Sequence, residues 1–215
     1  MFTRPVVIAL VAALLAGLGL MAGKRVFDRA SASPWPATRA VELHAPREVS
    51  AFNLAQSDGT RLVPGELRGH WTLVYLGFTA CPDVCPTALA ELAQAQKRWQ
   101  ALPEATRPRL LFVSVDPERD SPARAGEYAR AFHRDSLAAS GDLPALENFA
   151  GALHLVFGKV PGKHFDENPN DYAVDHSASI AVLDPEGRLA GLIRPPFDPA
   201  AIADDMTLLT KAPVP

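Results

Sequence analysis

Cysteine is scarce in this chain of 215 residues, which contains only two, Cys81 and Cys85. A chain of this length can bury a sizeable core without disulfide staples, so the thiols are not needed to hold the fold. Two cysteines also cannot supply the four ligands that a closed structural zinc site usually needs. The cysteine count therefore favours one small thiol site rather than a structural framework.

An excess of positive charge is lacking too, because the formal net charge is -3. The Lys and Arg residues are scattered, with no basic cluster interleaved with aromatic residues. Nothing in this pattern attracts a polyanion over long range, so we exclude nucleic acid as a partner. Internal repeats and low-complexity tracts are absent as well, and a hydrophobic content of 48% is typical of one globular domain with an appendage.

The appendage is the N-terminal segment, where an uncharged apolar run extends from Pro5 to Gly23. Its length is at the short end for a membrane-spanning helix. A cleaved signal peptide would look similar. However, the best small-residue cleavage candidate, at 30–32, lies beyond several charged residues, so we favour an uncleaved anchor. We expect the following organisation: a membrane anchor at 1–25, a linker at 26–46 and a folded domain at 47–211.

The orientation of the predicted anchor is not decided by its flanking charges. Arg4 and the α-amino group precede the apolar run, and Lys24, Arg25 and Arg29 follow it together with Asp28. This near balance leans slightly toward a cytoplasmic domain, but long domains translocate despite such charges. Charge alone therefore leaves the orientation open.

The rest of the chain alternates between short apolar runs with strand character and segments with helical periodicity. Two turn signals, at 57–59 and 184–187, predict hairpins. The expected strands are 51–54, 61–63, 71–78, 109–115, 177–183 and 189–193, and the expected helices are 86–102, 121–133, 143–154 and 199–209. This alternation predicts an α/β fold with a partly parallel sheet covered on both faces.

The two cysteines lie between a predicted strand and a predicted helix, where an α/β sheet places its ligand crevice. Cys85 falls at the start of the helix, so we expect the helix dipole to lower the pKa of its thiol. Redox pairs most often have two residues between the cysteines, whereas this pair has three. Two thiolates also suit Cu(I), and an added imidazole can hold Cu(II). The spacing leaves both a redox dithiol and a metal site open.

Three sequence blocks narrow the choice: GFTACPDVCP at 77–86, VSVDPERDSP at 113–122 and DYAVDHS at 171–177. In this order and spacing they resemble the Sco/SenC family, and the resemblance covers Leu43 to Leu209. It implies a thioredoxin-like fold, here with an N-terminal β-hairpin extension and one preceding transmembrane helix. It also implies that Cys81, Cys85 and His176 bind one copper ion, as Cu(I) or Cu(II).

The function implied by the resemblance is that of a copper chaperone. Such a protein delivers copper to the binuclear copper site of cytochrome c oxidase, or reduces the cysteines of that site. The implied partners are the copper-site subunit of the oxidase and a periplasmic copper donor. Because the family's domain lies outside the cytoplasm, we expect a single-pass inner-membrane protein whose domain faces the periplasm.

Two enzyme functions remain as alternatives, so the sequence does not decide whether the protein is an enzyme. The first is a thiol-disulfide oxidoreductase with Cys81 and Cys85 as its redox-active pair, and the weaker one is a peroxidase. Thioredoxin-like redox enzymes carry a proline just before the strand that faces their cysteines. Here Asp175, His176 and Ser177 occupy the comparable stretch, which favours the chaperone.

Several other polar residues have expected roles. Asp175 either orients His176 by accepting a hydrogen bond or is a solvated loop acid. Asp83 either tunes the thiolates or has a turn-stabilising or solvent role, and the acids at 116–120 are expected to serve turns and helix capping rather than partner binding. We expect surface or cap roles for His44, His70, His133, His154 and His164.

Overall fold

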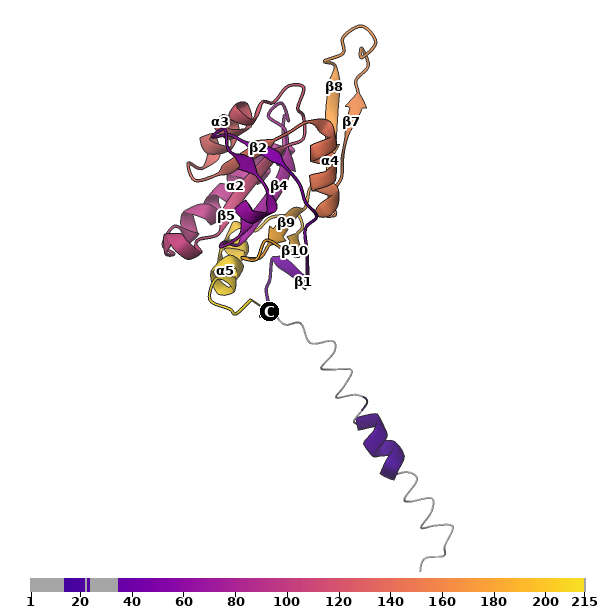
Figure 1. Cartoon of the computed structure of the whole chain (residues 1–215), viewed down its shortest axis with the longest axis vertical. Helices are drawn as coiled ribbons and strands as arrows, with labels where there is room; N and C mark the ends of the chain where they lie inside the picture. Colours follow the sequence, from indigo (N-terminus) through magenta and orange to yellow (C-terminus); the bar gives the residue numbers. More distant parts are fainter. Residues whose placement is uncertain (1–13, 22, 24–34, 215) are drawn as a thin grey trace, which may run out of the picture. The chain divides into compact units, whose positions relative to one another are not determined.

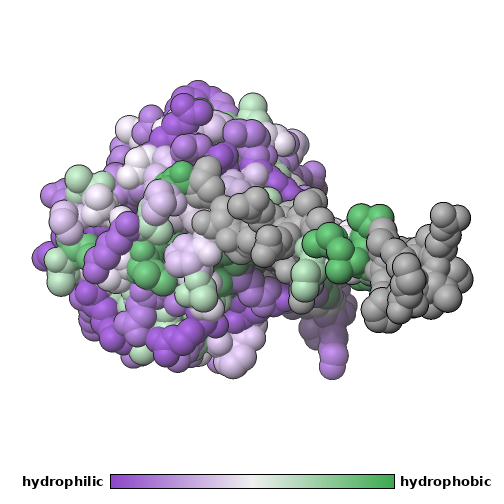
Figure 2. All heavy atoms as spheres, turned by 90° about the horizontal axis from the view of Figure 1, so that it is seen from below, coloured by the Kyte–Doolittle hydropathy of each residue, from purple (hydrophilic) through white to green (hydrophobic). Residues whose placement is uncertain are grey.

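The computed structural model describes residues 14–21, 23 and 35–214. The chain divides into two units, Met1–Pro34 and Trp35–Pro215. In the first unit residues 14–21 are helical, and their large hydrophobic side chains are exposed (Figures 1 and 2). Among the described residues, no helix combines the length and the apolar character needed to cross a membrane. Most of the anchor predicted at 1–25 lies outside the described residues.

The second unit is built on a mixed sheet of eight strands in the order β1-β10-β9-β4-β5-β6-β2-β3. Strand β4 pairs in parallel with β5, and β5 pairs in parallel with β6, whereas the other pairs are antiparallel. The strands are β1 (Val41–Arg47), β2 (Leu54–Gln56), β3 (Arg61–Leu62), β4 (Thr72–Gly77), β5 (Arg109–Ser114), β6 (Leu137–Ser140), β9 (Ile180–Leu183) and β10 (Leu189–Ile193). The predicted α/β fold with a partly parallel sheet is confirmed.

Four helices and two short 3-10 helices complete this unit: α2 (Val84–Trp99), α3 (Pro122–Phe132), α4 (Leu143–Ala152), α5 (Pro199–Leu209), η1 (Pro64–Leu67) and η2 (Glu104–Thr106). The cap residues Ser121 and Asp142 accept hydrogen bonds from backbone amides of the first turns, and a proline follows in each first turn. Helix α2 packs against both α3 and α5. Every residue of β4 is buried, as a central strand covered on both faces requires.

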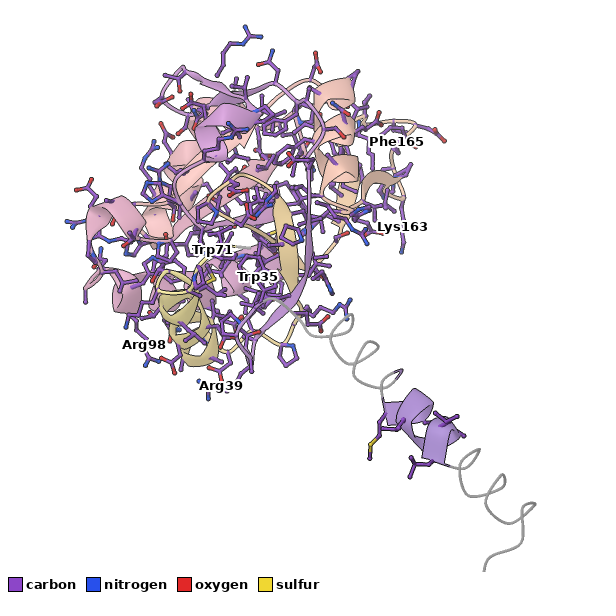
Figure 3. All side chains as sticks on the ribbon, turned by 60° about the horizontal axis from the view of Figure 1, so that its bottom comes forward. Trp35, Arg39, Trp71, Arg98, Lys163 and Phe165 are labelled. Atoms are coloured by element: carbon purple, nitrogen blue, oxygen red, sulfur yellow. The ribbon has the colours of Figure 1, made fainter. Side chains whose placement is uncertain are left out.

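The second half of the predicted linker at 26–46 belongs to the folded unit, so that part of the prediction is wrong. Strand β1 pairs with β10, and Trp35 packs edge-on against Trp71 with the ring centroids 5.3 Å apart (Figure 3). The buried carboxylate of Asp205 on α5 also accepts hydrogen bonds from the backbone amides of residues 39, 40 and 41. These long-range contacts order a segment whose local composition is typical of a linker.

A second sheet was not predicted. It is an antiparallel pair of β7 (Phe157–Pro161) and β8 (Tyr172–His176), joined by a long loop, and it extends beyond the main sheet in Figure 1. Most of β7 is exposed, so it lacks the alternating hydrophobic pattern that signals a strand. His176 is the last residue of β8, rather than the residue before the strand predicted at 177–183.

Candidate metal centre

The cysteine loop connects β4 to α2. Cys81 lies in the loop, where its backbone amide donates to the carbonyl of Phe78 at 3.3 Å. Cys85 is the second residue of α2, and its backbone amide donates to Sγ of Cys81 at 3.3 Å. Cys81 is 8% exposed and Cys85 is completely buried. The start of the helix thus fixes the two thiols beside each other under the surface.

Gly77, the last residue of β4, makes room for this arrangement. A Cβ atom at this position would lie 3.2 Å from Sγ of Cys85 and 2.7 Å from the ring of Phe112. Contacts this short would force the ring or the helix to move. The absence of a side chain at residue 77 is therefore part of what places Cys85.

The third side chain comes from β8. Nε2 of His176 lies 3.3 Å from Sγ of Cys85, and one ligand atom each from Cys81, Cys85 and His176 lie within 4.8 Å of one another. Nδ1 of His176 lies 3.1 Å from the carbonyl oxygen of Ser177. Because a carbonyl only accepts, Nδ1 carries the proton, and the lone pair of Nε2 faces the thiols. The three predicted ligands are together, with the imidazole in the tautomer that ligation requires.

Aromatic rings hold the imidazole in place. The His176 ring meets Tyr75 and Phe78 edge to face, with centroid separations of 5.8 and 6.2 Å. Asp175, which precedes it, is exposed, and the partner of Nδ1 is a backbone carbonyl instead. The expectation that Asp175 orients His176 is therefore wrong, and its alternative as a solvated acid agrees with the structure.

Burial controls protonation at this site. It raises the pKa of the Cys85 thiol to about 12, and a hydrogen bond with Cys81 adds to the rise. The predicted lowering of this pKa is therefore wrong, because desolvation of the thiolate outweighs the helix dipole. Burial also lowers the pKa of His176, which favours its neutral form. A cation that binds here must displace thiol protons but finds the imidazole already neutral.

The other candidate residues lie outside the cluster. Asp83 is exposed at the N-cap of α2 and makes no side-chain capping bond. Across the described part of the chain, no histidine except His176 belongs to a group that could hold a metal. His133 is the C-cap residue of α3, which confirms the expected cap role, but it is buried, and burial lowers its pKa.

Two acids of the second sequence block, Asp116 and Asp120, are buried and cap no helix, whereas Glu118 is exposed. Asp120 accepts hydrogen bonds from the backbone amide of Thr79 at 2.7 Å and from Oγ of Ser114 at 2.6 Å. Thr79 lies in the cysteine loop, so Asp120 ties that loop to β5. Asp116 accepts a hydrogen bond from the hydroxyl of Tyr172 at 2.7 Å and so ties the same region to β8. This role of the second block was missed because it depends on tertiary contacts.

A groove of about 390 Å³ opens next to the start of α2, and neither thiol lines it. Its lining is mostly apolar and comes from β4, from the start of α2, from the connection between β8 and β9 and from the segment after β10: Tyr75, Asp83, Val84, Thr87, Ala88, Glu91, Ala178, Pro195, Pro196 and Phe197. Val84, the neighbour of Cys85, is 61% exposed at its edge. Sequence reasoning missed the groove because its walls come from separate parts of the chain.

Comparison with known proteins agrees with the fold. The SCO1/SenC family matches residues 41–211. The chain belongs to this family. The mitochondrial SCO2 homologue of Mus musculus is 33% identical over 136 residues, which cover 63% of this chain and 52% of the mouse protein. A Stutzerimonas stutzeri protein, provisionally named as copper-binding, is 33% identical over 153 residues, or 70% of this chain and 71% of that protein.

Solved SCO1/SenC structures share the architecture. Yeast Sco1 with copper bound has a TM-score of 0.70 and 29% identity, over 79% of this chain and 92% of that one. Bradyrhizobium japonicum ScoI with copper bound has a TM-score of 0.65 and 31% identity, over 74% of this chain and 98% of that one. The thioredoxin-like Sco fold is thus confirmed. The chain spans about half the length of the mouse, bovine and human relatives that it matches.

Proposed function

We propose that this SCO1/SenC protein is a copper chaperone that binds one copper ion through Cys81, Cys85 and His176. The observation that carries the proposal is the convergence of two thiols and one imidazole within 4.8 Å. Two thiolates satisfy Cu(I), and the added nitrogen allows the same site to hold Cu(II). The neutral His176 and the buried thiols form a site that excludes most water, which protects a soft ion from competing ligands.

The cargo is delivered to the binuclear copper site of cytochrome c oxidase. This part of the proposal rests on the family membership and on the copper-bound relatives. The groove lined by Tyr75 and Val84 supports it, because an apolar surface next to the residue that precedes Cys85 gives a partner protein a place to dock. A periplasmic copper donor supplies the copper ion to the same three ligands.

Copper transfer between purified proteins tests the function. The domain is loaded with Cu(I) and mixed with the metal-free copper-site domain of the oxidase, and the copper content of each is measured after separation. We expect transfer from the parent and none from a Cys81→Ser, Cys85→Ser double variant, which has no thiolates to load. If the parent binds no copper, or binds it and retains it in the presence of the acceptor, the chaperone function is refuted.

Reduction of the acceptor's cysteines is the second candidate function. It is favoured by the closeness of the thiols, because the Sγ atoms of Cys81 and Cys85 lie within 4.8 Å of each other. In this reaction the two thiols form a disulfide while the acceptor disulfide takes up two electrons and two protons. Thiol counting on an oxidised acceptor, with copper absent, separates this reaction from copper delivery.

We also propose that residues 1–25 anchor the protein in the inner membrane, with the domain in the periplasm. The apolar run from Pro5 to Gly23 supports the anchor, and the family resemblance supports the orientation. Alkaline extraction and a reporter fused after residue 215 test both points. We expect retention in the membrane and a periplasmic reporter signal, and a soluble protein or a cytoplasmic signal would contradict the proposal.

A further inference from the structure

The strand that carries His176 is tied to the cysteine loop by a cationic side chain. Arg119 lies in the segment between β5 and α3, and its guanidinium carbon is 3.8 Å from the ring centroid of Tyr172 and 5.6 Å from that of Phe78. Tyr172 begins β8, the strand that ends at His176. Phe78 precedes Cys81 and accepts its amide hydrogen bond. One guanidinium therefore contacts both halves of the proposed copper site.

Hydrogen bonds fix the orientation of this guanidinium. Nε of Arg119 donates to the carboxylate of Asp116, and Nη1 donates to the carbonyl oxygen of Tyr172 at 3.1 Å. The hydroxyl of Tyr172 donates in turn to the other carboxylate oxygen of Asp116 at 2.7 Å. The three residues form a closed ring through the backbone carbonyl and the hydroxyl of Tyr172, and we call this ring the Arg119 clamp. These bonds use Nε and Nη1 of the guanidinium, whereas Nη2 of Arg119 is buried without a hydrogen-bond partner among the residues that the structure describes.

The outer face of Tyr172 is held from the other strand of the pair. Lys159 on β7 places its ammonium 3.9 Å from the Tyr172 ring centroid and pairs with Glu118 at 2.7 Å. Tyr172 thus lies between two cations, and both of them are paired with acids of the segment 116–119. The β7–β8 pair is connected to the segment between β5 and α3 at several points close together.

These connections matter because β7 and β8 form a sheet of their own. A two-stranded ribbon is only marginally stable unless it packs on something else. His176 and Tyr172 share one face of β8, because side chains alternate along a strand. A shift of Tyr172 would therefore move His176, whose Nε2 atom is 3.3 Å from Sγ of Cys85.

We propose that Arg119 is a positioning residue that holds His176 at ligand distance from Cys81 and Cys85. The inference rests on the proposed copper site and adds a residue that determines its geometry. Arg119 does not touch the ligand atoms. It acts through Phe78, against which the His176 ring also packs, and through Tyr172 at the start of β8. Cu(II), which needs the imidazole, depends on the clamp, whereas Cu(I) held by two thiolates does not.

The test compares Arg119→Gln, Arg119→Lys and a control, Arg98→Gln. Arg98 forms an exposed ion pair with Asp204 and lies beside α5 with Arg39 (Figure 3). For Arg119→Gln we expect Cu(II) affinity to fall by about tenfold or more, as for other groups that orient a ligand. We expect weaker nitrogen coupling in its Cu(II) electron paramagnetic resonance spectrum and Cu(I) affinity within about twofold of the parent. Arg119→Lys should recover part of the Cu(II) affinity, because it keeps the charge over the rings but loses the fork of donors.

A second measurement needs no copper. In the metal-free protein, amide hydrogen exchange at residues 172–176 should speed up in Arg119→Gln, while exchange in the buried strand β4 stays as in the parent. Tyr172→Phe keeps the ring and removes only the bond to Asp116, so it gives a milder variant if Arg119→Gln fails to fold. It should show a smaller change of the same kind.

Different results would contradict the positioning role of Arg119 and the proposed copper-binding function. If a folded Arg119→Gln variant keeps the Cu(II) affinity, the Cu(II) spectrum and the exchange rates of the parent, the positioning role is overturned and the copper site stands. The same result in Tyr172→Phe has this meaning if Arg119→Gln does not fold. A parent that binds no copper would overturn the proposed function, and the exchange measurement would still decide whether the clamp holds β8.

Discussion

Sγ of Cys85 and Nε2 of His176 lie 3.3 Å apart although 91 positions separate the two residues in the chain. The first is placed by the start of α2 and the second by the end of β8, and each element is packed on a different part of the fold. The ligand set is therefore a tertiary feature, which changes remote from the ligands can disturb.

Gly77→Ala is expected to displace Cys85 within this ligand set. The new Cβ would meet the Phe112 ring at 2.7 Å and Sγ of Cys85 at 3.2 Å, and such overpacking costs about 1–3 kcal/mol. Urea unfolding should show this loss, and copper affinity should fall with it. Gly151→Ala is the control, because its Cβ would meet nothing within 4 Å and alanine favours helix α4. Equal stability of the two variants would count against the described packing.

Oxidation is expected to join Cys81 to Cys85 and to abolish copper binding. The two Sγ atoms belong to one cluster with ligand atoms within 4.8 Å, and a disulfide offers no thiolate. Mass spectrometry should show the loss of two hydrogens, and equilibrium dialysis should show no bound copper until a reductant is added. Undiminished copper uptake by the oxidised protein would refute the claim.

Asp205→Ala is expected to destabilise the domain by about 3 kcal/mol, because it leaves three backbone amides at 39–41, including that of the buried Val41, without their acceptor. The adjacent Asp204→Ala is a matched control. Asp204 forms only exposed ion pairs with Arg39 and Arg98, so its loss should change stability by less than about 1 kcal/mol. Chemical unfolding of both variants decides the point, and similar effects would show that Asp205 does not hold β1 to α5.

His133 is expected to make the domain less stable in mild acid. Burial lowers its pKa, Arg134 and Lys97 add to the lowering, and Asp135 opposes it. A histidine with a lowered folded pKa is protonated more readily when unfolded, so stability is full above the unfolded pKa of about 6.5 and declines as pH falls below it.

His133→Gln should therefore lose less stability than the parent between pH 8 and pH 5. The comparison uses the free energy of unfolding at each pH, and the contribution of His176, which has the same sign, is present in both proteins. An unchanged slope in the variant would show that His133 does not titrate on unfolding.

Local signals were sufficient for much of the fold. Ser121 and Asp142 mark helix starts that the structure confirms, and the apolar run at 71–78 contains the buried strand β4. What local signals could not reveal depends on distant partners. The segment 41–47 becomes a strand only because β10 and Asp205 lie beside it.

The resemblance named the three candidate ligands that the structure brings together, but their protonation was not predicted correctly. The position of Cys85 at a helix start predicts a lowered pKa, whereas its complete burial, which depends on the packing of β4 and α2, raises it. The Arg119 clamp was not predicted, because it also depends on tertiary packing. Arg119 and Tyr172 are 53 positions apart, and no pattern in either segment links them.

The central claim is that His176 completes a copper site with Cys81 and Cys85, and parallel Cu(I) and Cu(II) titrations of the parent and His176→Ala test it most directly. The parent should bind one ion in either state, with nitrogen coupling in the paramagnetic resonance spectrum of Cu(II). His176→Ala should lose that coupling and at least about tenfold in Cu(II) affinity, while two thiolates keep Cu(I) affinity close to that of the parent. A variant that binds both ions as the parent does, with the same spectrum, would contradict the account.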